Sequence, residues 1–242
     1  MSFSKILCGL LITCSILFLG LQSVNQEFNA FGVKSLGMLL LLSFYCVSVS
    51  QKNRLFSLFL VIYTFADIYN YVTYDFFPAE GVTYDVHYLV GNFLYILAYL
   101  LLIFRILELM NFKDAWRKFP YQLLLLFALD VFVVWVLIDL VRSTLVTDYA
   151  YIIELLYNLT VMILVSLALI NYMQNDTKKS MNLLIGTICI LFSEVIQIAY
   201  YYLSSLDKTL NIAYSVFLVL AFVFFFIQSK LPSKHFLVRS SS

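Results

Sequence analysis

Eight stretches of the chain are apolar enough, and about long enough, to cross a lipid bilayer as helices. They lie at about 5–22, 34–50, 55–74, 88–107, 121–141, 150–172, 181–203 and 210–228. A spanning helix needs about 20 mostly apolar residues, and these stretches cover about two-thirds of the chain. Because the connections are short, helices that follow one another are expected to pack antiparallel. The pattern predicts an all-α, polytopic transmembrane bundle of eight helices, forming a single transmembrane domain over residues 1–242.

The amino-acid composition supports a membrane protein. Hydrophobic residues make up 63% of the chain, against about 45–50% in soluble domains. Charged residues make up 12%, about half of the usual share of roughly 25%. A soluble fold of this size could not bury so much apolar surface. An aqueous globular domain, a disordered chain, a coiled coil and a nucleic-acid-binding protein are therefore excluded, and a net charge of +1 implies no electrostatic partner.

Basic residues fall mainly on one side of the predicted membrane. Of the 15 Lys and Arg residues, 12 lie at one set of span ends and loops: Lys5, Lys52, Arg54, Arg105, Lys113, Arg117, Lys118, Lys178, Lys179, Lys230, Lys234 and Arg239. The opposite side holds Lys34, Arg142 and Lys208. By the positive-inside rule, both termini are expected to be cytoplasmic. Acidic residues gather in the loops of the other side: Glu27, Asp75, Glu80, Asp85, Asp148 and Asp207.

The first span has an alternative interpretation as a signal peptide. Lys5 precedes an apolar run from Ile6 to Leu21. That run is slightly long for a signal sequence, and no A-x-A cleavage site follows it. We therefore expect an uncleaved helix. Cleavage would leave seven spans and an N-terminus on the outer side.

No sequence motif indicates a metal or a cofactor. The four cysteines lie inside predicted spans without metal-binding spacing, which is typical of small packing residues. The two histidines, His87 and His235, are expected in separate loops and make no metal site. The chain also contains no glycine-rich phosphate loop and no nucleophile elbow.

Acidic residues inside the spans are the main candidates for chemistry, because ionisable groups are costly in a membrane. Asp139 and Glu154 lie near span ends, where they are expected to reach water. Asp67, Asp130 and Glu194 lie deeper. The helical rise places Asp67 about 20 Å, Glu194 about 22 Å and Asp130 about 18 Å from the cytoplasmic span ends. Three carboxylates at nearly one level predict one shared polar cavity.

The sequences around two of these acids match. Each has a Phe two residues before the acid, an amide three after and a Tyr seven after; the amides are Asn70 and Gln197. On a helix, these offsets keep the groups on one face. The match is typical of internal repeats in membrane proteins. Asn92 and Asn158 are further candidates to line the cavity, although single amides also form hydrogen bonds between helices.

The chain resembles the lysoplasmalogenase-like (YhhN-type) family of eight-helix membrane proteins. Three segments carry the resemblance: Val33-Lys34-Ser35-Leu36, Phe65-Ala66-Asp67, and Gly186 to Glu194 with its Phe192-Ser193-Glu194 end. The chain departs from the family pattern at three places. Ser35 replaces a proline, Glu194 replaces an aspartate, and the fourth span lacks the usual histidine, where Leu97-Ala98-Tyr99 stands.

The resemblance implies hydrolysis of the vinyl ether bond of a lysophospholipid. A pair of carboxyls suits this reaction, because one donates a proton and the other stabilises the cation or activates water. We assign Glu194 as the acid and Asp67 as the stabiliser or base, with Lys34 at the outer end of its span holding the lipid phosphate. The lipid is the expected partner, in a bacterial inner membrane or, alternatively, a eukaryotic internal membrane. A proton-coupled transporter and a non-catalytic lipid-binding protein stay open as alternatives.

Overall fold

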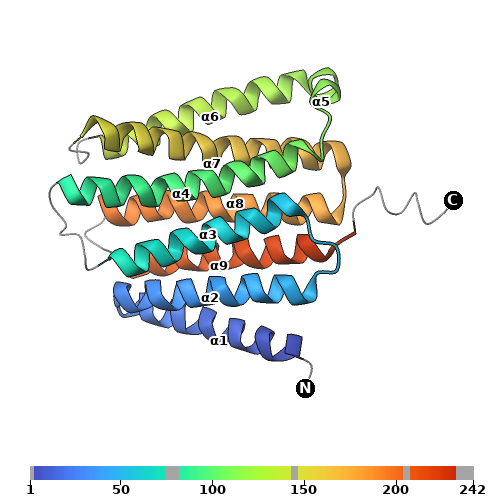
Figure 1. Cartoon of the computed structure of the whole chain (residues 1–242). Helices are drawn as coiled ribbons and strands as arrows, with labels where there is room; N and C mark the ends of the chain where they lie inside the picture. Colours follow the sequence, from blue (N-terminus) through green and yellow to red (C-terminus); the bar gives the residue numbers. More distant parts are fainter. Residues whose placement is uncertain (1–2, 75–81, 143–146, 204–207, 233–242) are drawn as a thin grey trace.

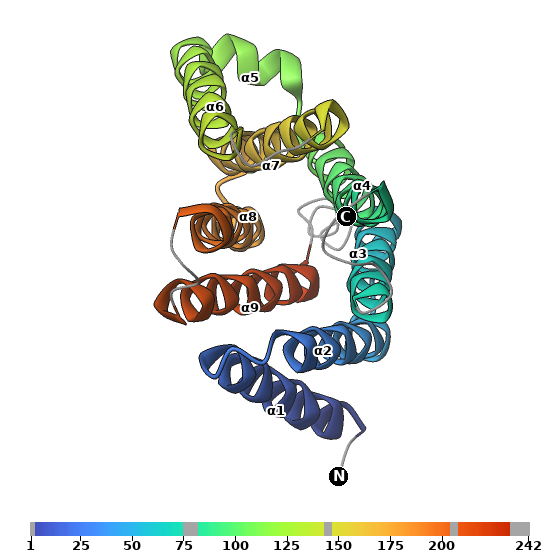
Figure 2. The same cartoon turned by 90° about the vertical axis from the view of Figure 1, so that its left-hand side faces the viewer.

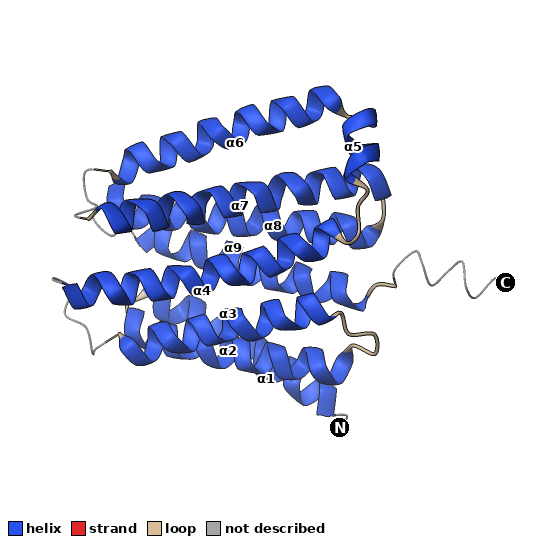
Figure 3. Ribbon diagram, turned by 45° about the horizontal axis from the view of Figure 1, so that its top comes forward, coloured by secondary structure: helices blue, strands red, loops and turns tan. Residues whose placement is uncertain are grey.

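The computed structural model describes residues 3–74, 82–142, 147–203 and 208–232, and every regular element within them is a helix (Figures 1 and 3). Eight helices are long and apolar enough to span a membrane, which confirms the predicted fold class. They are α1 (Phe3–Ser23), α2 (Glu27–Ser48), α3 (Arg54–Thr73), α4 (Val82–Leu107), α6 (Pro120–Val141), α7 (Asp148–Asn175), α8 (Lys178–Ile198) and α9 (Lys208–Lys230). A π-helical turn, Ala199–Leu203, continues α8.

Two helix starts differ from the predicted ones in ways that matter for the site, and one short helix was not predicted. Helix α2 begins at Glu27, so Lys34 lies about 10 Å inside the helix rather than at its outer end. Helix α4 begins at Val82, so His87 is a helical residue and not a loop residue. A short helix, α5 (Phe112–Lys118), lies between the fourth and fifth predicted spans, and the Asn111 side chain caps its N-terminus.

Several residues of the sequence argument lie outside the described part of the chain. They are Asp75, Glu80, Asp207, Lys234, His235 and Arg239.

Seven of the eight spanning helices form a closed ring. Helices α1, α2, α3, α4, α7, α8 and α9 each pack on the next, and α9 packs back on α1 (Figure 2). Helix α6 lies outside the ring, mainly against α7. The start of α1 and the end of α9 lie at the same end of the bundle, as an even number of spans requires (Figure 1). We call this the terminal end; the charge pattern predicts that it is cytoplasmic.

Aromatic side chains fill the ring towards its terminal end. Phe59 of α3 packs edge-on against Phe225 of α9 at 5.7 Å, and Tyr63 packs against Phe222 at 4.7 Å between ring centroids. A Cβ at Gly186 would lie 2.6 Å from the Phe225 ring, so this glycine lets α8 and α9 approach closely. Because aromatic side chains fill this end, open space inside the ring lies towards the opposite end.

Candidate active site

A polar cavity of about 380 Å³ lies inside the ring, at the end away from both chain termini. All seven ring helices contribute to its wall, and α6 contributes none. Besides several tyrosines, its ionisable and amide side chains are Gln22, Glu27, Lys34, Asn70, His87, Asn92, Glu154, Glu194 and Gln197. The sequence analysis selected five of these residues, namely Lys34, Asn70, Asn92, Glu194 and Gln197. The cavity therefore joins residues from helices that are far apart in sequence.

Lys34 and Asp67 form an ion pair between α2 and α3. The Lys34 Nζ lies 2.9 Å from Asp67 Oδ1, and the exposed fractions of the two side chains are 17% and 1%. The Tyr95 hydroxyl donates a second hydrogen bond to the same oxygen at 2.6 Å. The Lys34 ammonium also lies over the rings of Tyr63 and Tyr95, at 5.7 and 5.6 Å from their centroids. These contacts compensate both charges, because an unpaired buried charge is costly.

Asp67 does not itself line the cavity. Lys34 lines it, and Asp67 lies behind, fully buried. The Ser35 hydroxyl of α2 donates to the Asp67 backbone carbonyl oxygen of α3 at 2.9 Å. The prediction of one shared polar cavity for the acids is therefore wrong for Asp67: Lys34 lines the cavity, and Asp67 binds the lysine from behind.

Asn70 extends the hydrogen-bonded chain from Asp67. Its amide Nδ2 donates to the Tyr95 hydroxyl at 3.1 Å, and that hydroxyl donates to Asp67. A Cβ at Gly91 would lie 2.6 Å from Asn70 Oδ1. A side chain at this position of α4 would displace the Asn70 amide, so Gly91 lets the amide lie against the helix.

Glu194 faces the cavity with tyrosine partners. The Tyr99 hydroxyl donates to Glu194 Oε1 at 2.9 Å, and the Tyr157 hydroxyl interacts with the same carboxylate. The two rings pack edge-on at 5.9 Å. Gln197, one turn further along α8, also lines the cavity. Tyr99 belongs to the Leu97-Ala98-Tyr99 segment of the fourth span, so a phenol from α4 contacts the acid there.

Glu154 is a cavity residue that the sequence analysis missed. It was expected to reach water at a helix end, but it is buried in the cavity wall. The Tyr88 hydroxyl donates to its Oε2 at 2.5 Å, and Asn158 Nδ2 donates to its Oε1 at 3.1 Å. Asn158 thus holds Glu154 and does not line the cavity. The spacing of this acid and amide, four residues apart on one helix face, was the available signal.

Asp130 lies outside the cavity, and the prediction of three carboxylates in one cavity is wrong for it. Its two carboxylate oxygens lie 2.8 and 2.9 Å from the Ser166 hydroxyl of α7, which donates to them. The residue is buried between α6 and α7, and α6 lies outside the ring. Depth along the helix axis does not give the direction in which a side chain points, so it could not show that Asp130 faces α7.

The rim of the cavity carries His87 and Asn92 from α4. His87 Nδ1 lies 2.8 Å from the Thr73 hydroxyl, and its ring stacks on Tyr69 at 5.5 Å. Asn92 Nδ2 donates to the Tyr88 carbonyl oxygen of its own helix at 2.9 Å. A histidine on the fourth span therefore does line the cavity, one turn before Gly91.

The chemistry available in the cavity is that of carboxyl, phenol, imidazole, amide and ammonium groups. Within the described ranges, no three His, Cys, Asp or Glu side chains gather as metal ligands would. No protein-family model, no curated protein and no solved structure matches this chain.

Proposed function

We propose that this multi-pass membrane protein is a hydrolase that cleaves the vinyl ether bond of a lysophospholipid in its polar cavity. The observation that carries the proposal is the pair Glu154 and Glu194, two carboxyls from different helices that line one cavity within the membrane-spanning bundle. The resemblance to the lysoplasmalogenase-like family supports the same reaction. By that resemblance, we also propose a bacterial inner membrane as the location.

In the proposed reaction, the Glu194 carboxyl donates its proton to the vinyl carbon further from the ether oxygen, which carries the hydrocarbon chain. The product is an oxocarbenium ion, which the Glu154 carboxylate stabilises by charge. Water then adds to the cation and loses a proton to a carboxylate. The resulting hemiacetal collapses to a fatty aldehyde and the free hydroxyl of the glycerophospho head group. Tyr99 and Tyr88 hold the two carboxyls in place through the hydrogen bonds described above.

The structure changes the role that we propose for Asp67. Its carboxylate is bound to Lys34 and lies behind the cavity wall, so it acts as a positioning residue for the lysine. An ammonium has three N–H donors, and Asp67 accepts from one of them. The remaining donors of Lys34 suit the phosphate of the head group.

The test is release of fatty aldehyde by purified protein from a 1-alkenyl lysophospholipid, with the 1-alkyl ether analogue as substrate control. The alkyl ether has no double bond to protonate, so it is expected to stay intact. Glu194→Gln and Glu154→Gln keep size and hydrogen bonding but remove the titratable proton. Each is expected to lower turnover by about 10²–10⁴-fold, as is typical of general acid–base groups.

Asp130→Asn is the matched control, because Asp130 is a buried membrane carboxyl outside the cavity. It is expected to keep wild-type turnover. The proposal is contradicted if no vinyl-ether lipid yields aldehyde, or if Asp130→Asn and Glu194→Gln lower turnover equally.

A non-catalytic lipid-binding protein is the second candidate. The observation that favours it is the Lys34–Asp67 ion pair. Asp67 was one of the two acids expected to be catalytic, and it pairs with Lys34 and does not line the cavity. This candidate predicts that lysophospholipid binds to the purified protein, that no aldehyde forms, and that Glu194→Gln alters binding alone.

A further inference from the structure

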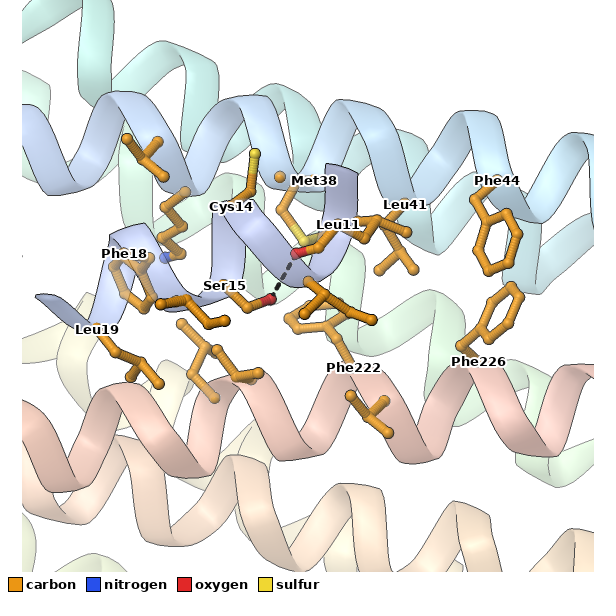
Figure 4. A pocket seen from close by; sticks show the side chains of 18 of the residues that line it. Leu11, Cys14, Ser15, Phe18, Leu19, Met38, Leu41, Phe44, Phe222 and Phe226 are labelled. Carbon is orange, nitrogen blue, oxygen red and sulfur yellow. Dashed lines mark hydrogen bonds between the residues drawn. The ribbon is translucent and has the colours of Figure 1, made fainter. Parts of the chain in front are cut away.

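A second pocket lies beside the polar cavity and is almost entirely apolar. It is a groove of about 430 Å³ between α1, α2 and α9 (Figure 4). Its wall is made mainly of Leu, Ile, Val, Phe and Met side chains. Ser15, a polar residue in this wall, donates its hydroxyl hydrogen bond to the Leu11 carbonyl oxygen of its own helix at 2.9 Å. The groove therefore suits a hydrocarbon and offers little to a polar ligand.

The groove and the polar cavity meet at Lys34. Three residues line both pockets: Phe18, Lys34 and Leu218. An amphiphile can therefore place its apolar part in the groove and its polar part in the cavity, with the lysine at the junction. The lysine is held there by Asp67, at 2.9 Å.

The other end of the groove is closed by an aromatic pair. Phe44 of α2 stacks on Phe226 of α9, with ring centroids 4.6 Å apart (Figure 4). The Lys230 ammonium lies over both rings, at 5.1 Å from Phe44 and 4.6 Å from Phe226. This cation–π contact ties the end of α9 to the pair. The groove is therefore closed at one end, and its length is set by the distance from Lys34 to Phe44.

That length suits one lipid chain. Lys34 and Phe44 are ten residues apart on α2, which gives about 15 Å of helix. The hydrocarbon core of a bilayer is about 30 Å thick, so a chain of one leaflet spans about the same 15 Å.

We propose that this groove holds the single hydrocarbon chain of a lysophospholipid, with the polar end at Lys34 and the chain end against Phe44 and Phe226. The inference rests on the proposed function, since it places the bond to be cleaved at the junction with the carboxyl cavity. It goes further in one respect: the aromatic pair limits the length of the chain that the protein accepts.

Gly37 gives a sharp test, because it lines the groove and has room for a side chain. A Cβ at this position would meet Cys14 Cβ at 3.8 Å, an ordinary van der Waals contact. Gly37→Ala is therefore expected to keep the groove open, and Gly37→Leu to fill it. Gly20→Leu is the control for adding a leucine nearby, because Gly20 has nothing within 4 Å and lines neither pocket.

Binding is measured by native mass spectrometry of the purified protein with 1-palmitoyl lysophosphatidylcholine. This lipid has an ester in place of the vinyl ether, so binding is read without turnover by the proposed route. Each methylene pushed out of the groove costs about fourfold in affinity, so Gly37→Leu is expected to weaken binding by about tenfold or more. Gly37→Ala and Gly20→Leu are expected to bind as wild type.

Phe44→Ala provides an independent test, in which binding is compared for lysophosphatidylcholines with acyl chains of about 12 to 20 carbons. This range includes chains shorter and longer than the thickness of one leaflet. The substitution opens the closed end, so the best-bound chain is expected to become longer. Unchanged binding by Gly37→Leu and an unchanged length preference in Phe44→Ala would overturn the inference. Binding that follows these expectations without aldehyde from the alkenyl lipid would instead contradict the proposed function and leave the groove assignment standing.

Discussion

The Lys34–Asp67 ion pair allows a quantitative test of the arrangement of α2 and α3. Lys34→Met keeps the length of the side chain and removes its charge. It leaves the Asp67 carboxylate, 1% exposed, with the Tyr95 hydroxyl and no counter-ion at its Oδ1. Breaking a buried pair from one side costs about 3–5 kcal/mol. We expect a loss of this size in the free energy of unfolding.

The reverse substitution is expected to cost less. Asp67→Asn leaves Lys34 without its counter-ion, but the lysine is 17% exposed and reaches the polar cavity. A loss of about 1–3 kcal/mol is expected, the usual cost of removing one partner of a buried hydrogen bond. The double variant removes both charges at once. Its stability is expected to lie closer to that of the wild type than the sum of the single losses, because no charge is left unpaired.

The measurement is equilibrium unfolding of the four proteins in mixed detergent micelles, giving a coupling free energy from the double-mutant cycle. We expect coupling of at least about 2 kcal/mol, which is well above the roughly 0.6 kcal/mol average of hydrogen bonds between membrane helices. Additive losses, with coupling near zero, would refute the ion pair as a stabilising contact. They would also remove the basis for assigning Asp67 a positioning role.

Three further predictions concern other parts of the molecule. Gly91→Ala is expected to cost about 1–3 kcal/mol in the same unfolding assay, because its Cβ would lie 2.6 Å from Asn70 Oδ1. Ser166→Ala, which removes the hydroxyl that bonds Asp130, is expected to lower stability by about 1–2 kcal/mol without changing lipid binding. Reporter fusions after Gln174 and after the last residue are expected to report the same compartment, the cytoplasm; opposite compartments would contradict the span assignment.

The eight membrane spans could be predicted from the sequence because they follow from a local property. In lipid, a chain satisfies its backbone hydrogen bonds within each segment, so a sufficiently long apolar stretch forms a helix whatever lies beside it. The i, i+3 spacing also placed Asn70 and Gln197 on the helix faces that carry the acids.

The neighbours of each acid were decided by the tertiary structure. Helical periodicity fixes which residues of one helix share a face, but it does not say which helix packs against that face. The ring closes through α4 against α7, and α6 is left outside. That order places Asp130 beside Ser166, brings Glu154 into the cavity and sets Lys34 between Asp67 and the open space. Each outcome depends on packing between helices distant in sequence, and no local pattern of residues records that packing.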